Sequence, residues 1–130
     1  MNFPEGLKYT REHEWIRDDG GDVYTVGITE HAAEQLGDVT YVELPEPGLV
    51  LDQGQPAGAV ESVKAASDVY APIGGHVSEI NQELERRPEL VNTSPYNDGW
   101  FFKIAEGNLR EFDTLMSSTE YTRFVEDLDE

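Results

Sequence analysis

Hydrophobic and polar residues alternate along most of the chain, in short runs separated by glycine- and proline-rich turns. Between residues 20 and 29, the alternation points Tyr24, Val26 and Ile28 to one side of a predicted strand. The run HEWIR, residues 13–17, can pair with that strand as a hairpin around the turn-forming sequence DDGGD. This part of the chain therefore predicts an antiparallel sheet.

Strand-like runs continue through the middle of the chain. They cover residues 38–48, 49–62, 69–81 and 99–105, and prolines end the first of them. In the last run, Trp100, Phe102 and Ile104 are expected to share one face. Many short strands joined by turns indicate a small β domain, built as a sandwich or barrel of antiparallel sheets.

A short helix is predicted within the β pattern, over residues 29–37. Thr29 is a suitable N-cap, Glu30 suits the positive end of the helix dipole, and Gly37 is a suitable terminator.

Residues 106–130 change to a helical period. Two capping boxes have the required spacing, Asn108 with Glu111 and Ser117 with Glu120. The second precedes four hydrophobic residues at helical spacing: Tyr121, Phe124, Val125 and Leu128. We expect an amphipathic helix that closes one end of the sheets, with a partner-binding helix as the alternative. Residues 1–130 are predicted to form one domain, with 106–130 packed on it.

The charge of the chain narrows the classes of partner. The formal net charge is -18, from 27 acidic and nine basic residues. Such a surface repels nucleic acid and anionic lipid and attracts basic protein surfaces, although it also simply favours solubility. No run of 18 apolar residues exists, and the first residues lack the layout of a targeting signal, so we expect a cytoplasmic protein.

Few residues suggest catalysis by the protein itself. The absence of cysteine excludes disulfides, thiolate metal sites and a cysteine nucleophile. His13, His31 and His76 show no metal-ligand spacing, and no phosphate-binding glycine motif is present. We therefore predict neither a catalytic site nor a metal site.

One lysine stands out, because the chain has only three: Lys8, Lys64 and Lys103. Lys64 lies between the strand-like sequences AVESV and AASDVY, at the expected tip of a hairpin. Burying an unpaired ammonium there would cost several kcal/mol, so we expect Lys64 to be exposed. A protonated, exposed lysine is a poor catalyst but an accessible target for covalent modification by another enzyme. An ordinary turn lysine is the alternative.

The sequence around this lysine resembles the lipoylation segment of the glycine cleavage H-protein family. The resemblance covers AVESVKAASDVYAPIGGHVSEIN and extends to LKYTREHEWIR, VGITEHAAEQLGDVTYVELPEPG, NTSPYNDGWFFKI and the tail STEYTRFVEDLDE, in family order. It implies a mainly β, lipoyl-type barrel-sandwich hybrid of two antiparallel sheets with short helices, one of them C-terminal.

The resemblance also implies a role as a non-catalytic carrier, with lipoate in amide linkage to Lys64. Its partners would be a lipoyl-attaching enzyme and the three enzymes of glycine cleavage. The first of these, glycine decarboxylase, uses pyridoxal phosphate and loads an aminomethyl group. A folate-dependent aminomethyltransferase then takes the one-carbon unit, and dihydrolipoyl dehydrogenase reoxidises the dithiol. A carrier that visits several enzymes is expected to be monomeric.

By the same resemblance, Glu14, Ser67 and Asp68 are the candidate contacts of the aminomethyl-bearing arm, because carboxylates stabilise a protonated amine. Glu12 stands where some relatives carry a small hydroxyl residue. This departure bears on the arm contacts, as does Gln35 on the short helix.

Three other functions are consistent with parts of the sequence. A biotin carrier shares the fold but typically flanks its lysine with methionines, whereas Val63 and Ala65 flank Lys64 here. An H-like protein that mainly relays lipoate to other 2-oxoacid dehydrogenase complexes would need the same lysine. The third alternative is an unmodified acidic adaptor.

Overall fold

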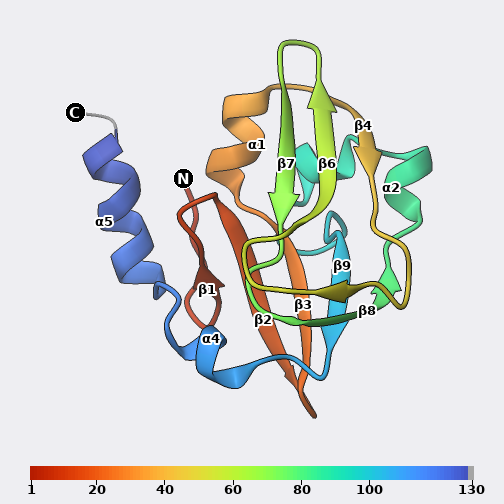
Figure 1. Cartoon of the computed structure of the whole chain (residues 1–130). Helices are drawn as coiled ribbons and strands as arrows, with labels where there is room; N and C mark the ends of the chain where they lie inside the picture. The colour runs from red at the N-terminus through yellow and green to blue at the C-terminus, as the bar shows by residue number, and fades with distance from the viewer. Residues whose placement is uncertain (129–130) are drawn as a thin grey trace.

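The fold, seen in a computed structural model that describes residues 1–128, consists of two antiparallel sheets with short helices around them (Figure 1). The six-stranded sheet has the order β1-β2-β3-β9-β8-β5, and the three-stranded sheet has the order β4-β6-β7. The strands are β1 (Lys8–Tyr9), β2 (Glu14–Gly20), β3 (Val23–Ile28), β4 (Val39–Glu43), β5 (Val50–Leu51), β6 (Pro56–Ser62), β7 (Ala66–Tyr70), β8 (Gly75–Ile80) and β9 (Phe102–Ala105). The helices are α1 (Glu30–Leu36), α2 (Glu83–Arg86), α3 (Leu90–Thr93), α4 (Leu109–Asp113) and α5 (Ser118–Leu128).

The main hydrophobic core joins the two sheets. Val26 and Ile104 from the six-stranded sheet belong to the same buried cluster as Val42, Val60 and Val69 from the three-stranded sheet. The predicted face of β3 is confirmed, since Tyr24, Val26 and Ile28 are all buried. The mainly β fold of two antiparallel sheets is therefore confirmed as well.

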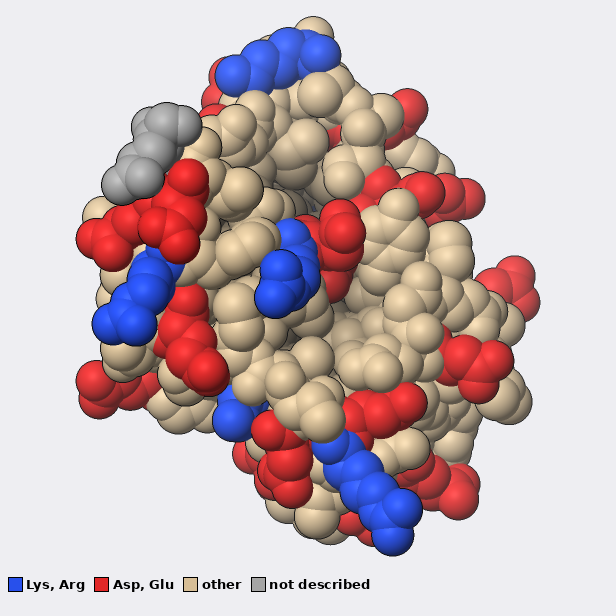
Figure 2. All heavy atoms as spheres, turned by 60° about the vertical axis from the view of Figure 1, so that its left-hand side comes forward, with Lys and Arg blue, Asp and Glu red and all other residues tan. Residues whose placement is uncertain are grey.

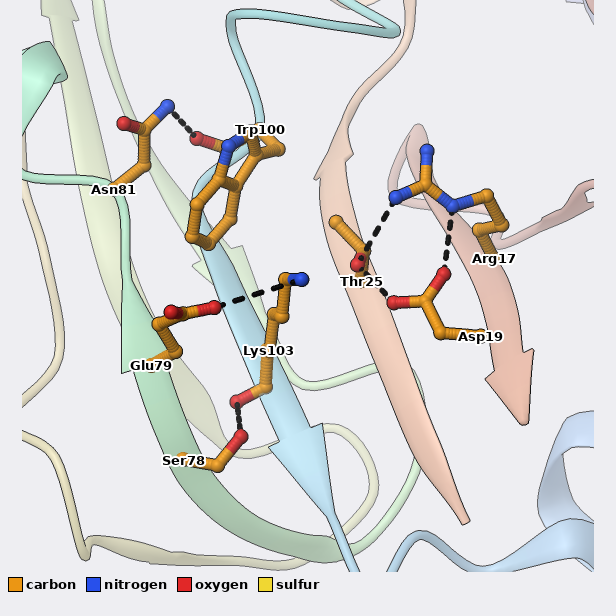
Figure 3. A network of polar contacts seen from close by, with 8 residues as sticks. All are labelled: Arg17, Asp19, Thr25, Ser78, Glu79, Asn81, Trp100 and Lys103. Atoms are coloured by element: carbon orange, nitrogen blue, oxygen red, sulfur yellow. Dashed lines mark hydrogen bonds and ion pairs between the residues drawn. The ribbon is translucent and has the colours of Figure 1, made fainter. Parts of the chain in front are cut away.

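The prediction that Trp100 shares a face with Phe102 and Ile104 is wrong. Trp100 precedes β9 and packs against a separate, smaller cluster, whereas Phe102 and Ile104 are buried in the main core. Figure 3 shows Trp100 beside Lys103 on the outer face of the six-stranded sheet, where the Lys103 amine lies 5.4 Å from the centre of the indole ring.

Local hydrogen bonds explain where the predicted helices begin and end. In α1, the Thr29 side chain accepts a hydrogen bond from the Ala32 amide, and Gly37 follows the helix with a φ of 75°. The Ser117–Glu120 capping box is complete, because each side chain accepts a hydrogen bond from the other residue's amide. These features were predicted correctly.

The Asn108–Glu111 capping box is only half formed. Asn108 caps α4 by accepting from the Glu111 amide at 3.1 Å. The Glu111 carboxylate instead accepts a hydrogen bond from the Gly74 amide at 2.7 Å, so it ties α4 to the turn before β8.

The C-terminal helix packs on the second cluster rather than on the main core. This cluster joins Tyr121 and Val125 of α5 to Tyr9 and Trp15. Figure 1 shows α5 beside β1, at the edge of the six-stranded sheet. Leu128, predicted on the apolar face, is 52% exposed. Residues 129 and 130 of the predicted C-terminal segment lie outside the described residues.

Within residues 1–128, no helix is both long and apolar enough to cross a membrane.

Candidate functional site

Lys64 occupies the turn between β6 and β7, the hairpin that projects at the top of Figure 1. Ser62 closes this turn: its amide donates to the Ala65 carbonyl at 2.8 Å, and its hydroxyl accepts from the Lys64 and Ala65 amides. The backbone that carries the lysine is therefore fixed by local hydrogen bonds.

The Lys64 amine is exposed, and it makes no ion pair or side-chain hydrogen bond with any residue between 1 and 128. Its aliphatic stem lies over the end of α1, because a Cβ added at Gly37 would be 3.3 Å from the Lys64 Cε. The neighbouring Val63 amide also donates to the Asp38 carbonyl at 3.2 Å. The tip of the hairpin thus rests against the end of α1.

A cleft of about 140 Å³ lies beside this hairpin, between α1, the start of β2, and β7. All three predicted arm contacts line it: Glu14 from β2, and Ser67 and Asp68 from β7. Glu12 and Gln35 line it as well. Ser67 and Asp68 are exposed, whereas Glu14 is 1% exposed.

Glu14 is the unusual carboxyl group of the cleft. Its two oxygens accept hydrogen bonds from the Thr10 hydroxyl at 2.5 Å and from the Tyr70 amide at 3.2 Å. Burial raises the pKa of Glu14 to about 7, more than these two hydrogen bonds lower it, and nearby Glu12 raises it further. Glu14 also borders a larger cavity, of about 370 Å³, on the side of Tyr9 and Tyr70. A cation placed in the cleft would favour the ionised form of Glu14.

Two histidines that are far apart in the sequence come together beside this cleft, and one of them lines it. The rings of His13 and His31 are 4.7 Å apart, centre to centre, and His13 lines the cleft. Burial, together with the neighbouring His31, lowers the pKa of His13 to about 4. No sequence spacing signals this pair, because it depends on the β2–β3 register that places Glu14 opposite Ile28.

No cluster suited to a metal ion accompanies the pair. Among residues 1–128, no three histidine, aspartate or glutamate side chains gather closely enough to bind one. His31 is buried, and its Nδ1 has no hydrogen-bond partner in the part of the chain that the structure describes.

The charge of the surface is predominantly negative. Figure 2, turned so that the α5 side comes forward, shows Asp and Glu side chains scattered over this face, with several Lys and Arg side chains among them. Exposed carboxylates also accompany the Lys64 hairpin, at Glu61 on β6 and at Asp68 on β7. Both strands of the hairpin therefore carry an exposed carboxylate near the lysine.

Comparison with known proteins identifies close relatives over nearly the whole chain. A family model described as "Glycine cleavage H-protein" matches residues 7–128. The "Glycine cleavage system H protein" of Laribacter hongkongensis is 54% identical over 124 residues, which are 95% of this chain and 98% of that protein. The protein of the same name from Salmonella arizonae is 50% identical over 97% of this chain and 98% of its own.

A solved structure is similar too. The crystal structure of a glycine cleavage system H protein from Mycobacterium marinum superposes with a TM-score of 0.83 at 34% sequence identity. The superposition covers 93% of this chain and 97% of that one.

Proposed function

The chain belongs to the glycine cleavage H-protein family, and on this premise we propose that it is a lipoylated carrier of the glycine cleavage system. Lipoate is attached in amide linkage to Lys64, where it supplies the sulfur atoms that carry the aminomethyl group. The protein presents this cargo to other enzymes and catalyses no step itself. As a carrier it acts as a monomer in the cytoplasm.

The observation that carries the proposal is the position of Lys64. An amine that another enzyme must reach has to project into solvent, and a competing carboxylate partner would hinder it. Lys64 is exposed and, within the described residues, unpaired, on a turn that Ser62 holds in place. These properties fit the chemistry of lipoate attachment. The absence of cysteine also fits, since no protein thiol can exchange with the dithiolane.

The cleft beside the hairpin supplies a docking place for the cargo. Its lining combines the apolar residues Ile28 and Leu36 with the carboxyl groups of Glu14 and Asp68. A protonated aminomethyl amine carries the charge that these carboxyl groups bind best. Docking in the cleft shields the aminomethyl group from water, so Glu14, Ser67 and Asp68 extend the lifetime of the loaded carrier.

In the same proposal, the carrier meets its partners in sequence. Glycine decarboxylase loads the cargo, the folate-dependent aminomethyltransferase removes the one-carbon unit, and dihydrolipoyl dehydrogenase restores the disulfide. A lipoyl-attaching enzyme acts once, at Lys64. The acidic surface suits docking onto basic surfaces of these enzymes.

The decisive experiment is the substitution Lys64→Arg, with Lys103→Arg as the matched control. Lys64→Arg keeps the charge and the exposed position, so the fold should survive. After co-expression with a lipoyl-attaching enzyme, we expect intact mass to show the lipoyl group on wild type and Lys103→Arg only. In a glycine exchange assay with the decarboxylase, Lys64→Arg should be inactive.

Three outcomes would contradict the proposal. A lipoyl mass on Lys64→Arg would place the modification elsewhere. A wild-type protein isolated from its native host at the mass of the sequence alone would favour the unmodified acidic adaptor. A modified protein that is inactive in glycine exchange, but donates lipoate to other 2-oxoacid dehydrogenase complexes, would favour the relay function.

A further inference from the structure

Tyr121 of α5 lies outside the cleft but contacts residues on two of its sides. Its hydroxyl lies 2.8 Å from His13 Nδ1 and 2.8 Å from Thr29 Oγ1. His13 lines the cleft next to Glu14. Thr29 is the N-cap of α1, the helix that contributes Ala32, Gln35 and Leu36 to the opposite side. One buried hydroxyl group therefore connects the β2 side of the cleft with the α1 side.

The Tyr121 hydroxyl is buried, so no other group can easily replace its hydrogen bonds to His13 and Thr29. Tyr121 and Thr29 are both 0% exposed, so water is a poor substitute for the phenol. Burial raises the pKa of Tyr121 and keeps it a neutral hydroxyl. Such a group can donate one hydrogen bond and accept another, and it can serve His13 and Thr29 at the same time.

His13 depends on this contact for its orientation. Its backbone has a φ of 70°, in the left-handed region that residues other than glycine rarely adopt. Its backbone carbonyl accepts from the Thr29 amide at 3.0 Å, which fixes the main chain. Within residues 1–128, the Tyr121 hydroxyl is the hydrogen-bond partner of the ring. The ring otherwise packs against His31 and Phe124, and these ring contacts are less directional than a hydrogen bond.

We propose that Tyr121 is a positioning residue for the cleft, and that α5 thereby sets the lifetime of the docked cargo. The His13 backbone is already tied to Thr29, so the Tyr121 hydroxyl acts on the His13 ring: it holds the ring against the start of α1, where the ring helps to enclose the aminomethyl group. This inference rests on the proposed carrier function for its effect on the cargo. Its effect on His13 does not depend on that function.

The chain offers a matched control, because Tyr9 belongs to the same cluster. The rings of Tyr9 and Tyr121 are stacked, with centres 4.7 Å apart, and Tyr9 is also 0% exposed. The Tyr9 hydroxyl donates to the Pro4 carbonyl and touches neither His13 nor Thr29. Tyr9→Phe and Tyr121→Phe therefore each remove one buried phenolic hydrogen-bonding group, but only the second removes the contact with the cleft.

The first measurement is the hydrolysis rate of the aminomethyl-loaded, lipoylated protein, at a temperature where both variants are folded. Loss of one buried hydrogen-bonding group should accelerate hydrolysis roughly fivefold in Tyr121→Phe. Tyr9→Phe should stay close to wild type. Equal rates in the two variants would overturn the role of Tyr121 in protecting the cargo.

The second measurement is the ¹⁵N NMR spectrum of the histidine side chains in the unmodified protein. We expect the His13 Nδ1 resonance to shift in Tyr121→Phe and to stay in place in Tyr9→Phe. An unchanged resonance in Tyr121→Phe would overturn the positioning role even if the carrier function holds. If wild type cannot be lipoylated or loaded, the carrier function fails, and this NMR comparison still tests the contact itself.

Discussion

Charged side chains on the outer face of the six-stranded sheet pair with opposite charges, whereas Lys64 and the carboxyl groups of the neighbouring cleft have no oppositely charged partner among residues 1–128. Lys103 lies 3.5 Å from the Glu79 carboxylate and over the Trp100 ring, with 30% of its side chain exposed (Figure 3). Lys64 projects from its turn and has no partner of this kind among residues 1–128. The Lys103 amine therefore stabilises the fold through its ion pair, whereas the Lys64 amine is free to be modified.

Two carboxyl groups show the same contrast. Burial works to raise the pKa of Asp19 on the outer face, but hydrogen bonds from Arg17 and Thr25 outweigh it and hold that pKa below its ordinary value. Burial dominates at Glu14 and raises the pKa to about 7. Paired groups on the outer face are thus stabilised in their charged form. In the cleft, by contrast, the Glu14 carboxyl group has no basic partner to stabilise its charged form.

The largest effect on stability is expected from Glu14→Gln. The folded-state pKa of Glu14 is raised, so between pH 4.5 and about 7 the folded protein binds more protons than the unfolded chain. The stability of wild type relative to Glu14→Gln should therefore fall as pH rises through this window. The full difference is about 3 kcal/mol. Urea unfolding of both proteins at pH 4.5, 6 and 8 measures it.

The control for this prediction is Glu61→Gln, since Glu61 is an exposed carboxylate of the same three-stranded sheet. This variant removes one negative charge from an exposed position, so it separates the effect of net charge from the effect of burial at Glu14. A constant difference between wild type and Glu14→Gln would mean that folding does not change the pKa of Glu14. The contrast between the cleft and the outer face would then be lost.

A smaller effect is expected when each lysine loses its amine. Lys103→Met removes the ion pair with Glu79 and the contact of the cation with Trp100, at a cost of about 1 kcal/mol. Lys64→Met should leave the free energy of unfolding unchanged, because the amine stabilises nothing in the fold. Urea unfolding of the unmodified variants at pH 7 measures both. Equal losses in the two variants would contradict the comparison.

The smallest effect is expected at Asp19, because its ion pair is only partly shielded from solvent. Asp19→Asn should cost about 0.5 kcal/mol at pH 7. A lowered folded-state pKa gives stability that is present above the ordinary pKa of the group and is lost as pH falls through the folded value. Unfolding at pH 7 and at pH 2.5 should therefore show a cost that is smaller in acid. A cost independent of pH would assign the effect to packing.

Much of the fold was predictable because its signals are local. The alternation of β3 and the capping residues Thr29 and Ser117 each act within a few positions of the chain, and the structure confirms them. The exposed position of Lys64 followed from the same local pattern. The helices α2 and α3 were not predicted, because each has four residues and no side-chain cap, too short for a helical period to emerge.

The features that were missed depend on contacts between distant segments. The His13–His31 pair forms only when the β2–β3 hairpin brings the two residues together. The Tyr121 hydroxyl reaches His13 and Thr29 from 108 and 92 residues away. Trp100 was predicted on the face of a strand and Glu111 in a capping box. Trp100 instead packs on the second cluster, and Glu111 accepts from the distant Gly74 amide. Burial of Glu14 likewise depends on β7, whose Tyr70 amide donates to it.

The stiff turn around Ser62 lowers the affinity that the cleft needs in order to hold a group attached to Lys64. A group tethered by a short flexible arm to a fixed anchor explores a small volume, so its effective concentration near the anchor is in the millimolar range. With the stem of Lys64 resting on the end of α1, that volume includes the neighbouring cleft. In the proposed carrier, a dissociation constant of about a millimolar is then sufficient to keep the lipoyl-bound cargo in the cleft, and such weak binding lets a partner enzyme remove it quickly.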